Sequence, residues 1–274
     1  MHPFESLEIP DGAIGLHWFG QSSFAIKSSS GIMILIDPFF PHERPAHTFI
    51  HPQSPLDEST LPADWVLLTH NHGDHTCIES IARIDAGPKN TRYMGAPESA
   101  AEITHSGIPP DRVHTITAGQ SLPIDNLTIH AVWSKPPGGN PGAGIKAPDI
   151  QHLGFVVALG DIRVYISGDP INNFADHEQL TEPIRSLQPQ LGLLTTHPNE
   201  GEFPFFKGSA EMAVKLGLQT AVPAHYDCFV ERNYDPHDWA KHFKHTACQP
   251  MIIPYNGSAT YRPTRNCALQ TPYS

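Results

Sequence analysis

The sequence predicts a layered α/β fold, and three features support this. Short apolar runs bounded by turn residues fill the first third of the chain, which is typical of buried strands. Strands then alternate with helical segments, and a further series of strands is again followed by such alternation. This order of elements favours an α/β layered sandwich over a barrel or an all-β fold. A hydrophobic fraction of 39% over 274 residues is enough to form a substantial core.

In the first half of the chain, each predicted strand is a short apolar run that ends near a polar or turn residue. One run ends at Asp37, and the Pro-rich stretch that follows it through Pro62 is expected to be a long surface loop. Helices are expected at residues 77–86 and 97–106, the second with a proline in its first turn. Strands are expected at residues 16–19, 23–27, 32–36, 65–69, 92–96, 113–116 and 127–133.

The second half begins with a loop at residues 136–144 that is rich in Pro and Gly and is a candidate lid. A hairpin is expected around Gly160 and Asp161. No linker rich in Pro, Gly or Ser separates two self-sufficient halves, so residues 1–274 are expected to form a single domain. The remaining elements are strands at residues 152–159, 163–167, 191–196 and 221–224 and a helix at residues 209–216.

Composition and charge exclude several classes of function. The chain has 17 Lys and Arg against 28 Asp and Glu, a formal net charge of −11, and no local basic cluster. This charge would repel a phosphate backbone, so we expect no nucleic-acid partner. No uninterrupted run of ~18 apolar residues is present, so we expect no membrane span.

The N-terminus has neither a basic start nor an apolar run, and the four cysteines show no CxxC spacing. We therefore predict a cytoplasmic protein with reduced thiols. Strand edges and apolar loops are compatible with a homo-oligomer, although no pattern specifies one.

The motif His70-x-His72-x-Asp74-His75 directly follows a predicted buried strand. Imidazole nitrogen and carboxylate oxygen together suit zinc, manganese or iron. On extended chain, residues i and i+2 project to one side, so His70 and His72 can bind one ion. If the chain turns at Gly73, Asp74 and His75 can face a second ion, and two ions ~3.5–4 Å apart could activate a bridging hydroxide.

Two metals need further ligands, and polar residues just after buried strands are the candidates. Asp169 follows the strand at 163–167, and its carboxylate could bridge both ions. His225 follows the strand at 221–224 and could complete the second site. The third histidine of the first site is most simply His152, with His197 and His130 as alternatives.

With this motif and with Asp169 and His225 further along the chain, the sequence resembles the metallo-β-lactamase-fold hydrolases over roughly residues 14–260. Residues 20–24 (GQSSF), 34–38 (ILIDP) and 165–169 (YISGD) resemble strand signatures of that family. Within it, PAHYD at 223–227 and the HLGFVV hairpin resemble the branch that contains L-ascorbate-6-phosphate lactonase.

The resemblance implies a four-layer αββα sandwich with two divalent ions, zinc or manganese, at the open edge between the sheets. It also implies that Asp37 orients a metal ligand. Many relatives carry a histidine shortly after the strand equivalent to 127–133, where this chain has Ser134-Lys135-Pro136. Either His152 replaces that histidine or the first ion is weakly bound. The implied metal ligands are His70, His72, Asp74, His75, Asp169 and His225.

The predicted activity is hydrolysis of a small polar ester or lactone by a metal-bound hydroxide, with a phosphorylated lactone as one candidate substrate. Asp74 is expected to hold the nucleophile and move protons. Tyr226 is expected either to donate a hydrogen bond to the oxyanion or to pack in the core. Candidate substrate-binding residues are Asn199, Lys207 and Trp133.

Two other functions remain open at this point. The first is a phosphodiesterase of the N-acyl-phosphatidylethanolamine phospholipase type, which would use the same metals on a phosphoryl centre. The second is a metal-binding protein without catalytic activity, which the missing histidine after residue 133 suggests.

Overall fold

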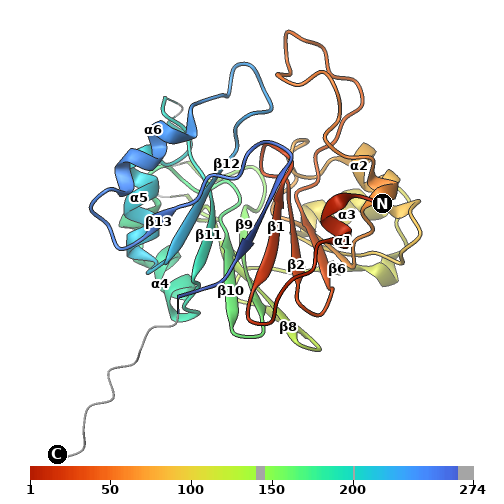
Figure 1. Cartoon of the computed structure of the whole chain (residues 1–274), viewed down its shortest axis with the longest axis horizontal. Coiled ribbons are helices and arrows are strands. Elements are labelled where there is room, and N and C mark those ends of the chain that lie inside the picture. Colours follow the sequence, from red (N-terminus) through yellow and green to blue (C-terminus); the bar gives the residue numbers. More distant parts are fainter. Residues whose placement is uncertain (140–145, 200, 265–274) are drawn as a thin grey trace, which may run out of the picture.

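Two seven-stranded mixed sheets face each other in the computed structural model, which describes residues 1–139, 146–199 and 201–264 (Figure 1). The first sheet has the order β14-β1-β2-β3-β4-β5-β6, in which β3 to β6 are parallel and the other pairs antiparallel. Its strands are β1 (Ile14–Trp18), β2 (Phe24–Ser28), β3 (Met33–Ile36), β4 (Trp65–Leu68), β5 (Arg92–Gly95), β6 (Val113–Thr115) and β14 (Gly257–Tyr261).

The second sheet has the order β13-β12-β11-β10-β9-β8-β7. Its strands β10 to β13 are parallel, and β7 to β10 pair antiparallel. Its strands are β7 (Ser121–Ile124), β8 (Leu127–Trp133), β9 (Leu153–Leu159), β10 (Ile162–Ile166), β11 (Leu191–Thr195), β12 (Thr220–Ala224) and β13 (Gln249–Pro250).

Helices cover the outer face of each sheet and complete four layers. In Figure 1, α1, α2 and α3 lie beside the first sheet, and α4, α5 and α6 lie beside the second. Each outer layer has its own apolar cluster, in which Ile81 of α2 packs with Val66 of β4, and Met212 of α5 packs with Leu194 of β11. The αββα prediction is therefore confirmed. The helices are α1 (Pro3–Ser6), α2 (Ile78–Asp85), α3 (Pro97–His105), α4 (Glu178–Ser186), α5 (Phe206–Lys215) and α6 (Pro236–Ala240), with 3-10 turns η1 (Glu58–Thr60), η2 (Pro110–Arg112), η4 (Phe174–Asp176) and η5 (Lys241–Phe243).

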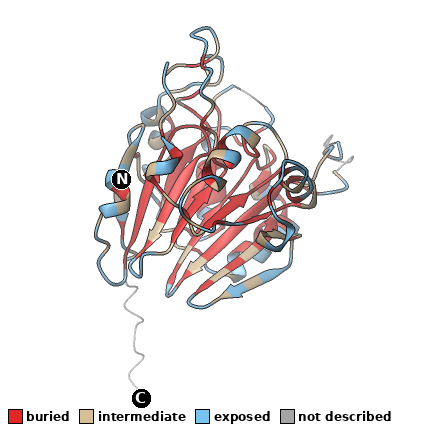
Figure 2. Ribbon diagram, turned by 90° about the vertical axis from the view of Figure 1, so that its right-hand side faces the viewer, coloured by how far each residue is buried: buried red, intermediate tan, exposed pale blue. Residues whose placement is uncertain are grey.

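The main core lies between the two sheets. Apolar side chains from both inner faces, such as Leu67 of β4, Phe155 of β9 and Val164 of β10, form one buried cluster. Figure 2 shows the strands largely buried, whereas the helices expose their outer faces. Because a side chain the size of Phe155 gains about 1.5–3 kcal/mol from burial, this cluster fixes how the sheets face each other.

One edge of this sandwich collects the ends of several strands. β3 and β4 end there, and so do β10, β11 and β12, because parallel strands finish at the same edge of a sheet. β9 begins at this edge because it runs antiparallel to β10. The Leu153 backbone N–H donates to the Thr69 carbonyl oxygen at 3.0 Å and joins the two sheets here.

The structure corrects several element predictions. α1, α4, α6, β7, β13 and β14 were not predicted from the sequence. α4 contains Pro183, which hides the helical pattern, and β13 is only two residues long. α5 begins at Phe206 rather than 209, so Lys207 lies in its first turn and not in a loop. The stretch through Pro62 is largely irregular as predicted, yet it buries Phe40 and Phe49 rather than lying wholly on the surface.

Other predictions lie partly outside the described residues. Residues 140–144 of the expected loop at 136–144 lie outside the described residues, so its role as a lid stays a prediction. Cys77, Cys228 and Cys248 carry free thiols, and Cys267 lies outside the described residues.

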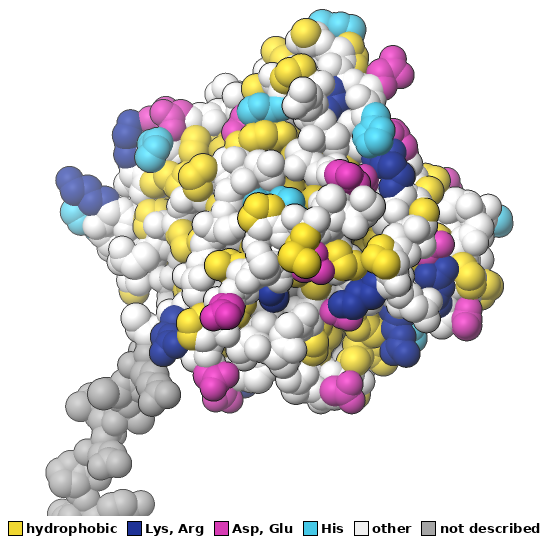
Figure 3. Space-filling view, turned by 45° about the vertical axis from the view of Figure 1, so that its right-hand side comes forward, with side chains coloured by type: hydrophobic (Ala, Val, Ile, Leu, Met, Phe, Trp, Pro, Cys, Tyr) yellow, Lys and Arg dark blue, Asp and Glu magenta, His cyan; other side chains and the backbone are white. Residues whose placement is uncertain are grey.

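The surface mixes charges, and no described helix suits a membrane. Lys and Arg side chains lie among Asp and Glu side chains over the face drawn in Figure 3. None of the helices that the structure describes is both long enough and apolar enough to cross a bilayer.

Replacing Phe155 by Ala should destabilise the fold by about 3–5 kcal/mol, because it leaves a cavity between the sheets. Val214→Ala, at a side chain that is 49% exposed, is the control and should change the free energy of unfolding by less than about 0.5 kcal/mol. Chemical denaturation measures both. Equal values for the two variants would contradict the assigned core.

Candidate metal centre

The segment after β4 makes a tight turn that presents its side chains in two directions. The backbone N–H groups of His75 and Thr76 donate to the His72 carbonyl oxygen at 2.9 and 2.7 Å. This turn separates His70 and His72 from Asp74 and His75, as the motif spacing predicts. α2 begins a few residues later and fixes the exit of the turn.

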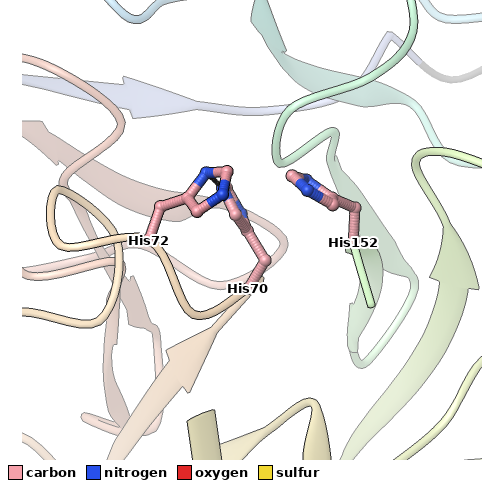
Figure 4. A group of neighbouring side chains, drawn as sticks. All are labelled: His70, His72 and His152. Atoms are coloured by element: carbon pink, nitrogen blue, oxygen red, sulfur yellow. Dashed lines mark hydrogen bonds between the residues drawn. The ribbon is translucent and has the colours of Figure 1, made fainter. Parts of the chain in front are cut away.

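A first group of three histidines lies where the two sheets meet. Nε2 of His70 and Nδ1 of His72 are 3.1 Å apart. The His152 ring stacks on that of His70 with a centroid separation of 4.2 Å. Figure 4 shows His70 and His72 projecting from the segment after β4 toward His152, which comes from the start of β9. Ligand atoms of the three lie within 4.8 Å of one another.

Asp169 lies between this group and a second one. Its Oδ2 is 3.6 Å from Nε2 of His70. Its Oδ1 is 3.5 Å from Nε2 of His75 and 3.7 Å from Nε2 of His225. The two carboxylate oxygens of Asp169 therefore face different sets of imidazoles.

The second group consists of Asp74, His75 and His225. Oδ2 of Asp74 is 3.8 Å from Nε2 of His75 and 3.7 Å from Nε2 of His225. His75 and His225 are fully buried, whereas the Asp74 side chain is 20% exposed. Asp74 is thus the member of this group that solvent or a substrate can reach.

Unusual backbone conformations aim these side chains. Gly168 has φ +55°, and a Cβ there would overlap the Leu153 carbonyl oxygen, so only glycine fits immediately before Asp169. His225 has φ +72°, which is rare for a residue other than glycine. Strained positions of this kind gather at functional sites, where the surrounding structure holds them.

A buried carboxylate beneath the cluster orients His75. Asp37 accepts hydrogen bonds from the Thr69 backbone N–H at 2.8 Å and the Thr69 hydroxyl at 2.7 Å. Nδ1 of His75 donates to Oδ2 of Asp37 at 2.8 Å, since a carboxylate can only accept from it. Nε2 of His75 is then the ring nitrogen that faces Asp169.

The buried carboxylates and imidazoles of the cluster shift one another's pKa values. Burial disfavours the charged form of His75, but Asp169, Asp74 and Asp37 outweigh it and raise the pKa of His75 well above its usual value. Burial likewise opposes the charged form of Asp169, yet the His75 and His225 imidazoles hold its pKa well below the usual range.

The histidines at the other end of the cluster favour the neutral form. Burial, with the charge of His75 next, lowers the pKa of His70. Burial and the Lys135 ammonium lower the pKa of His152 to about 3. Neutral imidazole is the form that binds metal ions.

A divalent ion fits this donor set. Nε2 of His75 and Oδ1 of Asp169 are buried, and neither has a hydrogen-bond partner among the described residues. Buried polar atoms without hydrogen-bond partners destabilise the folded state unless a group such as a metal ion binds between them. Imidazole nitrogens and carboxylate oxygens are the ligands that zinc and manganese accept.

Two cavities open at opposite ends of the cluster. One, of about 580 Å³, is lined by His72 and His152 and has polar walls that include Lys135. The other, of about 700 Å³, is lined by Asp74 and by the aromatic rings of Phe39 and Phe229. We call them the polar cavity and the aromatic cavity.

Comparison with known proteins assigns the family. The family model described as the beta-lactamase superfamily domain matches residues 33–226, well over half of the chain. This chain belongs to the beta-lactamase superfamily. The matched stretch runs from the first residue of β3 to the residue after His225 and so includes every member of the cluster.

This superfamily member also resembles individual proteins. It is 28% identical over 232 residues to a UPF0173 metal-dependent hydrolase of Pyrobaculum calidifontis, which covers 82% of this chain and 89% of the relative. Igni18, a metallo hydrolase from Ignicoccus hospitalis, superposes with a TM-score of 0.69 at 18% identity and covers 92% of this chain and 100% of Igni18. An isothiocyanate hydrolase from Delia radicum gut bacteria superposes with a TM-score of 0.69 at 20% identity, over 90% and 98% of the two chains. The structural likenesses show the fold alone.

In this beta-lactamase superfamily protein, the structure brings together all seven residues that the sequence suggested as ligands. Of the three histidines considered for the first group, His152 lies there, because Trp133 pairs with Leu153 and so sets His152 opposite Ser134. His197 and His130 are not in any of the described metal-ligand groups. The ligand roles of the seven clustered residues are taken up below as a proposal.

Four further residues were predicted to act in catalysis or substrate binding. Tyr226 is buried in the core, with its ring stacked between Trp18 and Tyr234. Asn199 is exposed, and the Lys207 side chain is 79% exposed beside Glu211.

Trp133 lies half-buried at the end of β8. Neither Trp133 nor Asn199 nor Lys207 is among the described residues that line the polar or the aromatic cavity. Catalysis by Tyr226 and substrate binding by these three residues stay predictions.

Two contacting residues were not assigned a role from the sequence. Gln21 donates from Nε2 to Oδ2 of Asp74 at 2.8 Å, and this nitrogen is 3.0 Å from Nε2 of His225. Thr69 connects Asp37 to His70 through its hydroxyl, 3.0 Å from Nδ1 of His70. The GQSSF signature includes Gln21, so the family resemblance was the signal that could have indicated it.

Gly168→Ala should displace Asp169 and reduce the metal content of the purified protein, because its Cβ would overlap the Leu153 carbonyl. The matched control is Gly160→Ala, which has a similar φ of +60° but nothing within 4 Å of the added Cβ. The control should cost about 1 kcal/mol of stability and keep its metal. Elemental analysis and denaturation test this, and equal metal content in both variants would refute it.

Proposed function

We propose that this protein is a metal-dependent hydrolase that holds two divalent ions and cleaves a carboxylic ester or lactone. The observation that carries the proposal is the placement of the Asp169 carboxylate between two groups of imidazoles, each 3.5–3.7 Å from it. The names of the curated relatives, which are metal-dependent hydrolases, support the reaction class.

The donor set divides naturally between two ions. His70, His72 and His152 would hold the first, and Asp74, His75 and His225 would hold the second. Asp169 would contact both. The Asp37 carboxylate keeps Nε2 of His75 directed at the site. Zinc and manganese are the proposed metals.

Bound divalent ions would polarise the carbonyl or phosphoryl oxygen of the substrate and lower the pKa of water. The protein's own groups would orient the reactants. Asp74 is partly exposed and faces the aromatic cavity, so its carboxylate can accept a proton from the attacking water and pass it to the leaving oxygen. Gln21 fixes the Asp74 carboxylate through the 2.8 Å hydrogen bond.

The lactonase-like branch is proposed from the PAHYD and HLGFVV segments. A phosphorylated substrate is supported by Lys135 and Lys146, which line the polar cavity beside His72. Lys135 is held at 2.6 Å by Glu202, which fixes the position of its ammonium group at this cavity. Asp149 and Glu202 line the same cavity, so a phosphate group would compete with Glu202 for Lys135 while Lys146 adds a second cation.

His72→Ala and Asp169→Ala should each lower the metal content and reduce kcat/KM at least about 100-fold, because each removes a proposed ligand. His130→Ala is the control, since His130 lies on β8 and contacts Ser121 instead. Elemental analysis and hydrolysis of ester and lactone panels measure the effects. Normal metal content and a normal hydrolysis rate in both variants would contradict the assignment of His72 and Asp169 as metal ligands.

His152→Ala should remove close to one of the two ions per chain, because His152 belongs only to the first group. The measurement is metal stoichiometry after dialysis against limiting zinc, compared with His130→Ala. An unchanged stoichiometry would show that His152 is not a ligand.

A substrate panel separates the reaction classes. Turnover of bis-p-nitrophenyl phosphate with none of esters or lactones would favour a phosphodiesterase. A protein with full metal content that is inert on all three classes would contradict the hydrolase proposal and favour a metal-binding role.

A further inference from the structure

We infer that the substrate carries an apolar group the size of an aromatic ring and that this group binds in the aromatic cavity, against Phe39 and Phe229 beside Asp74. The inference rests on the proposed function and adds the chemical class of the substrate to it. It differs from the small, uniformly polar lactone that the sequence suggests.

The wall of the aromatic cavity is a cluster of three phenylalanine rings. The Phe39 and Phe229 centroids are 5.6 Å apart, and both rings also contact Phe49, at 6.2 and 5.3 Å. Phe49 is buried, whereas Phe39 and Phe229 are only half-buried and line the cavity. Rings at such separations favour stacked and edge-to-face packing, so a further ring can join the cluster.

This wall is held in place before any ligand binds. The Ile50 backbone N–H donates to the Cys228 carbonyl, and that of Val230 donates to the Thr48 carbonyl, both at 2.9 Å. The buried Arg44 guanidinium lies 4.3 Å from the centroid of the Phe49 ring. A preformed apolar wall binds a ligand without the cost of ordering loops.

The position of the cavity connects it to the chemistry. Asp74 and Gly73 line the aromatic cavity, and Asp74 belongs to the second proposed metal group. His72 and His152, from the first group, line the polar cavity at the other end of the cluster.

A bond cleaved at the cluster would therefore have one side of the substrate in each cavity. The volume of about 700 Å³ on the aromatic side falls in the range of cavities that bind drug-sized ligands. The apolar part would lie on the Asp74 side and the polar part on the side of Lys135.

Selectivity for matched substrates tests the inference. The zinc-loaded protein should hydrolyse methyl phenylacetate with a kcat/KM at least about tenfold above that for methyl acetate, and γ-phenyl-γ-butyrolactone should exceed γ-butyrolactone similarly. Phe229→Ala and Phe39→Ala should each reduce this ratio severalfold while metal content stays unchanged. Phe229→Leu, which keeps an apolar side chain, should retain part of the preference.

Phe205→Ala is the matched control, since Phe205 is 42% exposed and is not among the described residues lining either cavity. It should leave the ratio and both rates unchanged. The inference would be overturned if the unmodified protein hydrolysed the aromatic and non-aromatic substrates with equal kcat/KM. It would also be overturned if neither Phe229→Ala nor Phe39→Ala reduced the ratio of the two kcat/KM values.

Binding measured without turnover separates this inference from the proposed function. By titration calorimetry, phenylacetate should bind the zinc-loaded protein at least about tenfold more tightly than acetate, and Phe229→Ala should remove the difference. Equal affinities would overturn the aromatic site. Hydrolysis without a preference for aromatic substrates would overturn this inference and leave the proposed function standing. Tight binding of phenylacetate by a protein that hydrolyses no ester, lactone or phosphodiester would overturn the proposed function and leave the aromatic site standing.

Discussion

The buried carboxylate of Asp169 is the feature on which the site depends. A charged carboxylate in the interior is unfavourable unless cations or hydrogen-bond donors surround it. Here the imidazoles of His70, His75 and His225 surround it, each between 3.5 and 3.7 Å away. The histidines are themselves buried, so their ring nitrogens also need partners. Two divalent ions would answer both requirements, since each would join imidazole nitrogens to a carboxylate oxygen.

The rest of the fold serves to bring these groups to one edge. β3, β4, β10, β11 and β12 end there and β9 begins there, and two sheets that share one core hold these strand ends at fixed positions. Close packing then demands particular residues, such as Gly168 beneath the Leu153 carbonyl. Asp37 and Thr69 connect the floor of the site to β3 and β4, so the orientation of His75 is tied to the first sheet.

The two cavities differ in chemical character, and this difference would orient a bound substrate. One end of the cluster is lined by charged and polar side chains, whereas the other adds two aromatic rings to Asp74, Glu231 and Arg232. A substrate with a polar and an apolar part would therefore bind in one orientation. Relatives of similar fold are named as hydrolases of different kinds, which fits the general rule that function resides in the site and not in the fold.

The sequence by itself determined the local chemistry. The six-residue motif at 70–75 and the apolar runs before Asp169 and His225 predicted the ligands, because strand ends and ligand spacing are local properties. Elements whose signal is not local were missed, such as β14, which forms only by pairing with β1 across most of the chain. Tertiary structure alone showed which of the three candidate histidines lies in the first group, since the β8–β9 register sets His152 beside His70. It also decided the aromatic wall, because Phe39 and Phe49 lie in the loop after β3 and Phe229 follows β12, and only the folded chain brings them together.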